Sequence, residues 1–173
     1  MKDIQGRLAA APMPEGYAQP RKNDRLFEYV DLDWGQCDFY PGQTPPVKFP
    51  CALLDINAAT YSNEGNLTQI GIITVQVRIL DMVLNNSSAM APVDQQKRVA
   101  RMFTLITETN KLLHGFHGAG YGPLTKQTLT RVKRRDGLKE FVLTYSVQLT
   151  DTSAAPAYRL IKVTPVVQAE MQE

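Results

Sequence analysis

The clearest pattern in the chain is the alternation of apolar and polar side chains from Leu67 to Leu80. One face of this segment carries Ile73, Val75, Val77 and Ile79, and the other carries Ile70 and Ile72 followed by Thr74, Gln76 and Arg78. A period of two predicts a long β-strand. We expect the aliphatic face to be core. On the second face, we expect another element to cover the apolar first half, and water or a partner to meet the polar second half.

Three other segments have strand-like patterns. Residues 47–56 predict a strand whose Pro50 belongs at its start or on an edge, because proline donates no ladder hydrogen bond. Residues 124–135 and 139–150 predict a β-hairpin, since an Asp-Gly pair lies between them. Large inward residues alternate along the second arm: Phe141, Leu143, Tyr145, Val147 and Leu149. Residues 26–33 predict a short strand, and the turn-like composition of 57–66 predicts a long loop.

A helix is predicted from Asp94 to Leu113, because apolar residues recur there at spacings of three and four. The stripe consists of Val99, Met102, Phe103, Ile106 and Leu113. A stripe of this width needs a sheet or another helix to cover it. We therefore expect Phe103 to be buried against the sheet.

Together these elements predict an α+β fold: a mainly antiparallel sheet of four or more strands with one long helix packed on it, plus a long β-hairpin and an extended N-terminal arm. The arm spans residues 1–46 and includes a short helix and a short strand, the core domain spans 47–153, and a C-terminal tail spans 154–173. Prolines and the aromatic group Trp34, Phe39 and Tyr40 suggest that the arm docks on a neighbouring subunit and becomes ordered only there.

Composition narrows the class of protein. The chain has 173 residues, which suits one domain, and 19 basic against 17 acidic residues give a formal charge of +2, too balanced to indicate nucleic-acid binding by net charge. Two cysteines are too few for a disulfide framework, and the N-terminus lacks the order of a signal peptide, so we expect synthesis in a reducing cytoplasm. No apolar run reaches the roughly 20 residues that a membrane-spanning helix needs.

Few residues suggest chemistry. His114 and His117 in a Gly-rich loop, with Asp55, are candidate metal ligands for a small enzyme, but they are too few for a recognisable site. Cys51 lies in a predicted strand, where a buried structural cysteine is the simpler interpretation. We predict no catalytic residue, no cofactor and no metal. The basic residues Lys133, Arg134 and Arg135 at the hairpin tip are either solvated or meet an acidic partner or DNA.

The order of elements, opened by FPCALLDI and closed by LTRVKRRDGLKEFVLTYSVQL, resembles the tail terminator (tail-completion) proteins of the head-tail interface of tailed phages and prophages. The resemblance covers roughly residues 47–150. It is carried by Phe49, Pro50, Leu53, Leu54, Leu112, Leu113 and the strand with Arg131. The long N-terminal arm departs from shorter members of that family.

The resemblance implies a structural virion protein without catalytic activity. It implies a homo-oligomeric, commonly six-fold ring that caps the tail tube, contacts the tube protein and the neck or connector proteins, and lets phage DNA pass without specific binding. Lys133, Arg134, Arg135, Trp34, Phe39 and Tyr40 are the partner-interface residues that we predict, with no membrane contact. The alternatives are a neck, stopper or tail-tube subunit of the same particle and, in a different class, a small metal-dependent enzyme.

Overall fold

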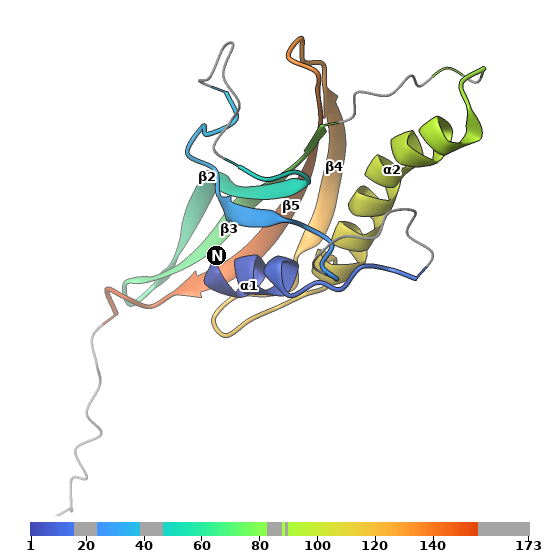
Figure 1. Ribbon diagram of the computed structural model, residues 1–173. Coiled ribbons are helices and arrows are strands. Elements are labelled where there is room, and N and C mark those ends of the chain that lie inside the picture. Colours follow the sequence, from blue (N-terminus) through green and yellow to red (C-terminus); the bar gives the residue numbers. More distant parts are fainter. Residues whose placement is uncertain (16–23, 39–46, 83–87, 89, 156–173) are drawn as a thin grey trace, which may run out of the picture.

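A five-stranded sheet forms the centre of the protein (Figure 1). The computed structural model describes residues 1–15, 24–38, 47–82, 88 and 90–155. The strands are β1 (Tyr29–Leu32), β2 (Cys51–Gly65), β3 (Thr68–Met82), β4 (Thr125–Val132) and β5 (Leu138–Asp151), in the sheet order β1-β2-β3-β5-β4. Strands β2, β3, β5 and β4 are paired antiparallel, and β1 joins β2 in parallel.

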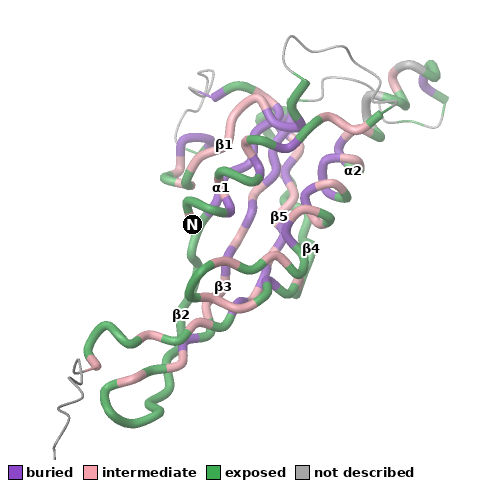
Figure 2. Tube along the Cα trace, turned by 90° about the horizontal axis from the view of Figure 1, so that it is seen from below, coloured by how far each residue is buried: buried purple, intermediate pink, exposed green. Residues whose placement is uncertain are grey.

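Two helices cover one face of this sheet, α1 (Lys2–Ala9) and α2 (Val93–Leu113). The face beneath them, called the helix-covered face below, carries the aliphatic side chains of β3 and their partners on β2 and β5. Val77, Ile79, Leu143 and Tyr145 are fully buried there. Figure 2 shows the buried positions concentrated in this part of the sheet and the exposed β2–β3 turn projecting beyond it. No described helix is long and apolar enough to cross a membrane.

The predicted fold class is wrong, because no single long helix packs along the sheet. Strands dominate the described residues, and α1 shares the cover with α2. The described buried residues of α2 begin only at Met102, whereas Val93 near its N-terminus is 65% exposed. Phe103, predicted to be core, is 62% exposed. The helix bounds themselves were predicted almost to the residue, and Met102, Ile106 and Leu113 are buried as expected.

Residues of the N-terminal segment contribute directly to this core. Ile4 and Leu8 of α1 are buried in the same cluster as the sheet residues, together with Leu26 and Phe27. Arg7 anchors α1 to α2, donating from Nε to the carbonyl oxygen of Leu112 at 2.6 Å. These residues are therefore packed within a single chain, although we expected the arm to become ordered on a neighbour.

The predicted loop at residues 57–66 is also wrong, because β2 continues as a strand to Gly65. A tight turn at Asn66 and Leu67, with φ of 51° and 59°, then leads into β3. Two consecutive positive φ angles are typical of the two-residue turns that match the twist of a hairpin. The long strand at 67–80, the hairpin 124–150 and the short strand near residue 30 are confirmed. Most of the predicted C-terminal tail, from residue 156 on, lies outside the described residues.

On the opposite face of the sheet, called the open face below, the described residues cover one end only. The loop that follows β1 folds over that end and forms a second small core with Cys37, Val47, Cys51, Leu53, Leu80 and Leu138. On this face of β3 we expected the first half to be covered and the second half to be open, and the structure shows the reverse. Arg78 in the second half is covered, whereas Ile72 in the first half is 57% exposed.

Candidate partner interface

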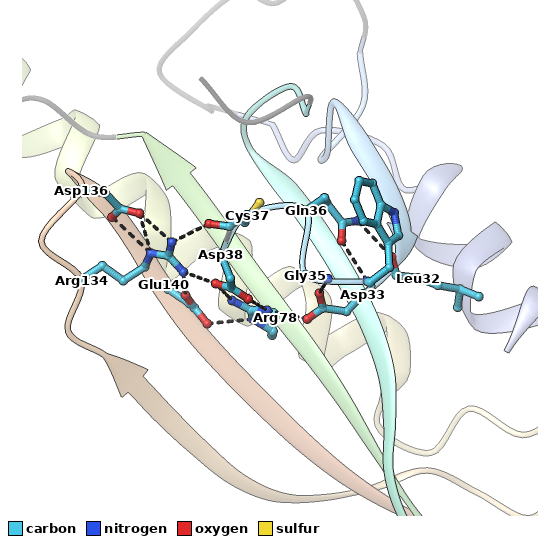
Figure 3. Close-up of polar contacts among 11 residues, drawn as sticks. Leu32, Asp33, Gly35, Gln36, Cys37, Asp38, Arg78, Arg134, Asp136 and Glu140 are labelled. Atoms are coloured by element: carbon cyan, nitrogen blue, oxygen red, sulfur yellow. Dashed lines mark hydrogen bonds and ion pairs between the residues drawn. The ribbon is translucent and has the colours of Figure 1, made fainter. Parts of the chain in front are cut away.

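An ion-pair network joins the covered end of the open face to the hairpin tip (Figure 3). We call it the arginine network; it consists of Asp33, Asp38, Arg78, Arg134, Asp136 and Glu140. Arg78 of β3 donates from Nη1 to Asp33 Oδ2 at 2.6 Å and from Nε to Glu140 Oε1 at 2.8 Å. It also forms a two-point contact with Asp38, at 2.8 and 2.9 Å. One guanidinium thus ties the loop after β1 to β3 and β5.

Arg134 completes the network from the hairpin tip. It donates to Asp38 Oδ1 at 2.7 Å, to Glu140 Oε2 at 2.9 Å and to Asp136 Oδ2 at 2.6 Å. It also donates to the carbonyl oxygen of Cys37 at 2.6 Å. Its side chain is only 14% exposed. A guanidinium fork suits such multiple acceptors better than an ammonium group, which explains why arginine occupies both centres.

The loop that supplies Asp38 is shaped by local hydrogen bonds. The carboxylate of Asp33 accepts from the Gly35 N–H at 3.0 Å, and Gly35 has a φ of 85°, which favours glycine. The fully buried Gln36 accepts from the Trp34 N–H and donates to the Leu32 carbonyl oxygen. These hydrogen bonds hold the turn-rich loop of residues 33–38, called the clasp below, over the sheet.

The network shifts the pKa values of its members. Hydrogen bonds from Arg78, and then from Arg134, lower the pKa of Asp38 to about 2. The hydrogen bond from Arg134 likewise lowers the pKa of Asp136. Burial opposes the charge on Arg78, but hydrogen bonds to Asp38, Glu140 and Asp33 outweigh it and raise its pKa. Asp38, Asp136 and Arg78 are thus ionised at neutral pH.

The predicted interface residues are distributed unevenly. Lys133 and Arg135 are exposed at the hairpin tip, whereas the guanidinium of Arg134 is engaged within the chain. Trp34 is 58% exposed beside the network. Phe39 and Tyr40 lie outside the described residues. An alternation pattern alone does not reveal that Arg134 is internal, since its partners Cys37 and Asp38 come from almost a hundred residues earlier.

The residues considered for an enzyme site lie in different parts of the fold. His114 follows the end of α2, where its Nδ1 accepts from the Lys126 N–H at 3.2 Å, and Asp55 lies on the exposed part of β2. Among the described residues, no group of three or more His, Cys, Asp or Glu side chains is arranged to hold a metal ion. Cys51 is buried and free, as the structural interpretation predicted, and the neighbouring Cys37 is also buried and free.

Beyond the arginine network, no described element covers the open face, which is largely neutral. The paired registers place hydroxyl and amide side chains there from four strands: Thr60, Ser62, Thr74, Gln76, Thr128, Thr130, Thr144, Ser146, Gln148 and Thr150. All ten are exposed or partly exposed. Asp55 lies at the margin, and Arg78 and Glu140 lie under the loop. Sequence alternation alone pointed to this surface but not to its extent.

Two strand edges flank the open face. On β2, the partner strand β1 reaches only to Leu54, and every residue from Asp55 to Gly65 is exposed. Among the described residues, none pairs with the outer edge of this segment or with the outer edge of β4. Unpaired edges present N–H and C=O groups that can pair with another chain.

Comparisons with known proteins give little further information. No protein-family model matches this chain, and a search of curated proteins finds no significant match. Among solved structures, the chain is similar to one from the virion of a native gene transfer agent particle, with 6% sequence identity and a TM-score of 0.40. The match covers 70% of this chain and 78% of that chain. A similarity of this size establishes neither a common fold nor a common function.

Proposed function

We propose that this protein is a structural subunit of a phage-like virion, a tail terminator whose ring caps the tail tube and joins it to neck proteins. The resemblance of residues 47–150 to the tail terminator family supports this assignment. The observation that carries the proposal is the neutral open face lying between two sheet edges with which no described strand pairs. The proposal includes no catalysis.

The chemistry of the two faces suits such a ring. A sheet that continues from subunit to subunit around a ring has one face toward the passage and one face outward. Because α1 and α2 occupy one face, the open face is the one available to line the passage. Hydroxyl and amide groups contact phosphates without the strong, salt-dependent attraction of several arginines, so DNA passes without being held.

The proposal is tested by combining solution mass, electron microscopy and genetic complementation. The purified protein is expected to form rings, and removal of its gene is expected to leave heads and tails unjoined. Long tubes of stacked rings would instead identify a tail-tube subunit. A monomeric protein whose removal leaves infectious particles unchanged would contradict the proposal.

The open face gives this test a matched pair of variants. Thr74→Lys with Gln76→Lys places two cations in the centre of the open face, while Thr74→Ser keeps its chemistry. We expect both proteins to form rings and only the lysine protein to impair DNA delivery, with an effect that weakens as salt rises. Equal DNA delivery by both proteins would show that the open face does not line the passage.

A further inference from the structure

We propose that the open segment of β2, Asp55–Gly65, pairs with strand β4 of a second copy of this chain, so that one sheet continues from subunit to subunit. This inference rests on the proposed function, because it identifies which edges close the ring. Both edges are exposed along almost their whole length. The two edges belong to the same sheet, at its opposite sides.

Strand direction favours this pairing. From β2 through β3 and β5 to β4, each neighbouring pair is antiparallel, so β2 and β4 run in opposite directions. A second copy in the same orientation, placed beside the first, therefore brings its β4 antiparallel to the β2 of the first. Antiparallel ladders are slightly more stable per residue than parallel ones. The contact is head-to-tail, which is the type that closes into rings.

Three exposed apolar residues near the two edges lie on the same face. Ile56 and Tyr61 of β2 are 48% and 47% exposed, and their registers with Val75 and Gly71 place them on the helix-covered face. Leu129 of β4 is 44% exposed on that same face.

An aromatic pair stands beside the β4 edge. Phe103 of α2 is 62% exposed, and its ring lies 6.2 Å from that of Phe141, which neighbours β4 through its pairing with Arg131. A continuous sheet would bring Ile56 and Tyr61 of one copy next to Leu129 and Phe103 of the other. Burial of such side chains drives association.

Charge is also complementary between the two edges. The open segment of β2 contains Asp55 and Glu64 and no basic residue, while β4 contains Lys126 and Arg131 and no acidic residue. The antiparallel direction brings the Asp55 end of β2 level with the Arg131 end of β4. Asp55 lies on the open face, whereas Lys126 and Arg131 lie on the helix-covered face, so the complementarity is one of net charge along the two edges and not of paired side chains. Opposite net charge favours the meeting of β2 with β4 over the meeting of two like edges. A second copy of the chain therefore satisfies the backbone and apolar groups and joins edges of opposite net charge.

Charge reversal tests this pairing. In one protein, Asp55→Lys and Glu64→Lys make the β2 edge basic; in the other, Lys126→Glu and Arg131→Glu make the β4 edge acidic. We expect each protein to stay monomeric by light scattering while keeping the parent's circular dichroism and unfolding midpoint. Mixing the two is expected to restore assembly with alternating subunits, because each edge then meets an edge of opposite charge.

The control is Lys2→Glu with Lys48→Glu, which lowers the net charge by the same amount as the β4 reversal, at exposed sites outside both edge segments. This control is expected to assemble like the parent. Phe103→Ser is expected to raise the concentration needed for assembly by about tenfold, through loss of the apolar contact.

Three results would overturn the inference. They are a parent chain that stays monomeric at every soluble concentration, reversed proteins that each assemble alone, and a mixture that fails while both proteins are folded. Rings formed by both reversed proteins would assign the edges to a different partner and leave the proposed function standing. If the parent protein forms no rings and removal of its gene leaves infectivity normal, the proposed function itself is wrong.

Discussion

Asp38 accepts hydrogen bonds from two guanidinium groups, and this arrangement makes the fold sensitive to acid. Its pKa falls from the ordinary 3.8 to about 2. Because the folded-state value is lower than the unfolded one, the stabilisation is fully present above about pH 4 and is lost as the pH falls toward 2.

We expect Asp38→Asn to lower the free energy of unfolding at neutral pH and to lose less stability than the parent between pH 4 and pH 2. Denaturant unfolding at several pH values measures both effects. Asp55→Asn is the control, since Asp55 is exposed and outside the arginine network. Parallel pH profiles for the parent and the Asp38 variant would show that this carboxylate does not stabilise the loop.

Arg134 and Arg135 are adjacent in the sequence but differ in environment. Arg134→Glu would place a fourth carboxylate beside Asp38, Asp136 and Glu140, and breaking a buried ion pair in this way costs about 3–5 kcal/mol. Arg135→Glu changes an exposed side chain, so we expect a change within about 0.5 kcal/mol.

Thermal unfolding of the two variants decides between these environments. Equal destabilisation would contradict the internal role of Arg134. The predicted docking role is then best tested on Lys133 and Arg135, because their reversal leaves the fold intact and tail attachment becomes the readout.

The exposure of Phe103 could not be predicted from the spacing of apolar residues in the helix. Its spacing from Ile106 and Met102 places it near the apolar stripe, but the covered width of a helix depends on how it lies on the sheet. The described buried residues of α2 begin at Met102, and Phe103 at the margin of the stripe stays exposed. The apolar pattern of one helix does not show the angle at which that helix lies on the sheet.

Among the elements, α1 lies in the arm that we expected to become ordered only on a neighbouring subunit, and yet it belongs to the core. Leu8→Ala removes a fully buried side chain and is expected to cost about 2–5 kcal/mol. Gly6→Ala in the same helix is the matched control, because an added Cβ meets nothing within 4 Å and alanine favours helix by roughly 0.5–1 kcal/mol.

Urea unfolding is expected to move in opposite directions for these two variants. If Leu8→Ala unfolds like the parent, α1 does not contribute to core stability. In that case the earlier expectation of an arm that orders only on a neighbour regains support.

The extent of β2 was missed for a different reason. Asn57, Asn63 and Asn66 read as turn residues, and a bulge between Ile56 and Ala58 interrupts the alternation that identifies a strand. Pairing with β3, whose pattern is strong, overrides the weak local preference. By contrast, the hairpin β4–β5 was predicted well because turn chemistry and alternation agree there.

For the whole molecule, local patterns predicted the long strands, the main helix and the hairpin, while non-local pairings decided the rest. The parallel position of β1, the clasp of residues 33–38 over the open face and the internal position of Arg134 all depend on contacts between distant segments. No single window of sequence contains such contacts. The candidate interface was therefore only partly predictable, with Arg135 and Lys133 exposed as expected.

The short strand β1 has a consequence of its own. It occupies the outer edge of β2 only from Cys51 to Leu54 and then leaves, so a strand arriving on that edge can slide no further than Asp55. In a sheet, slippage by two residues preserves the faces and is otherwise easily tolerated. In the proposed pairing, β1 would act as an end stop that fixes how far one subunit travels along the next, so the geometry of the assembly would be set by a strand that pairs only within its own chain.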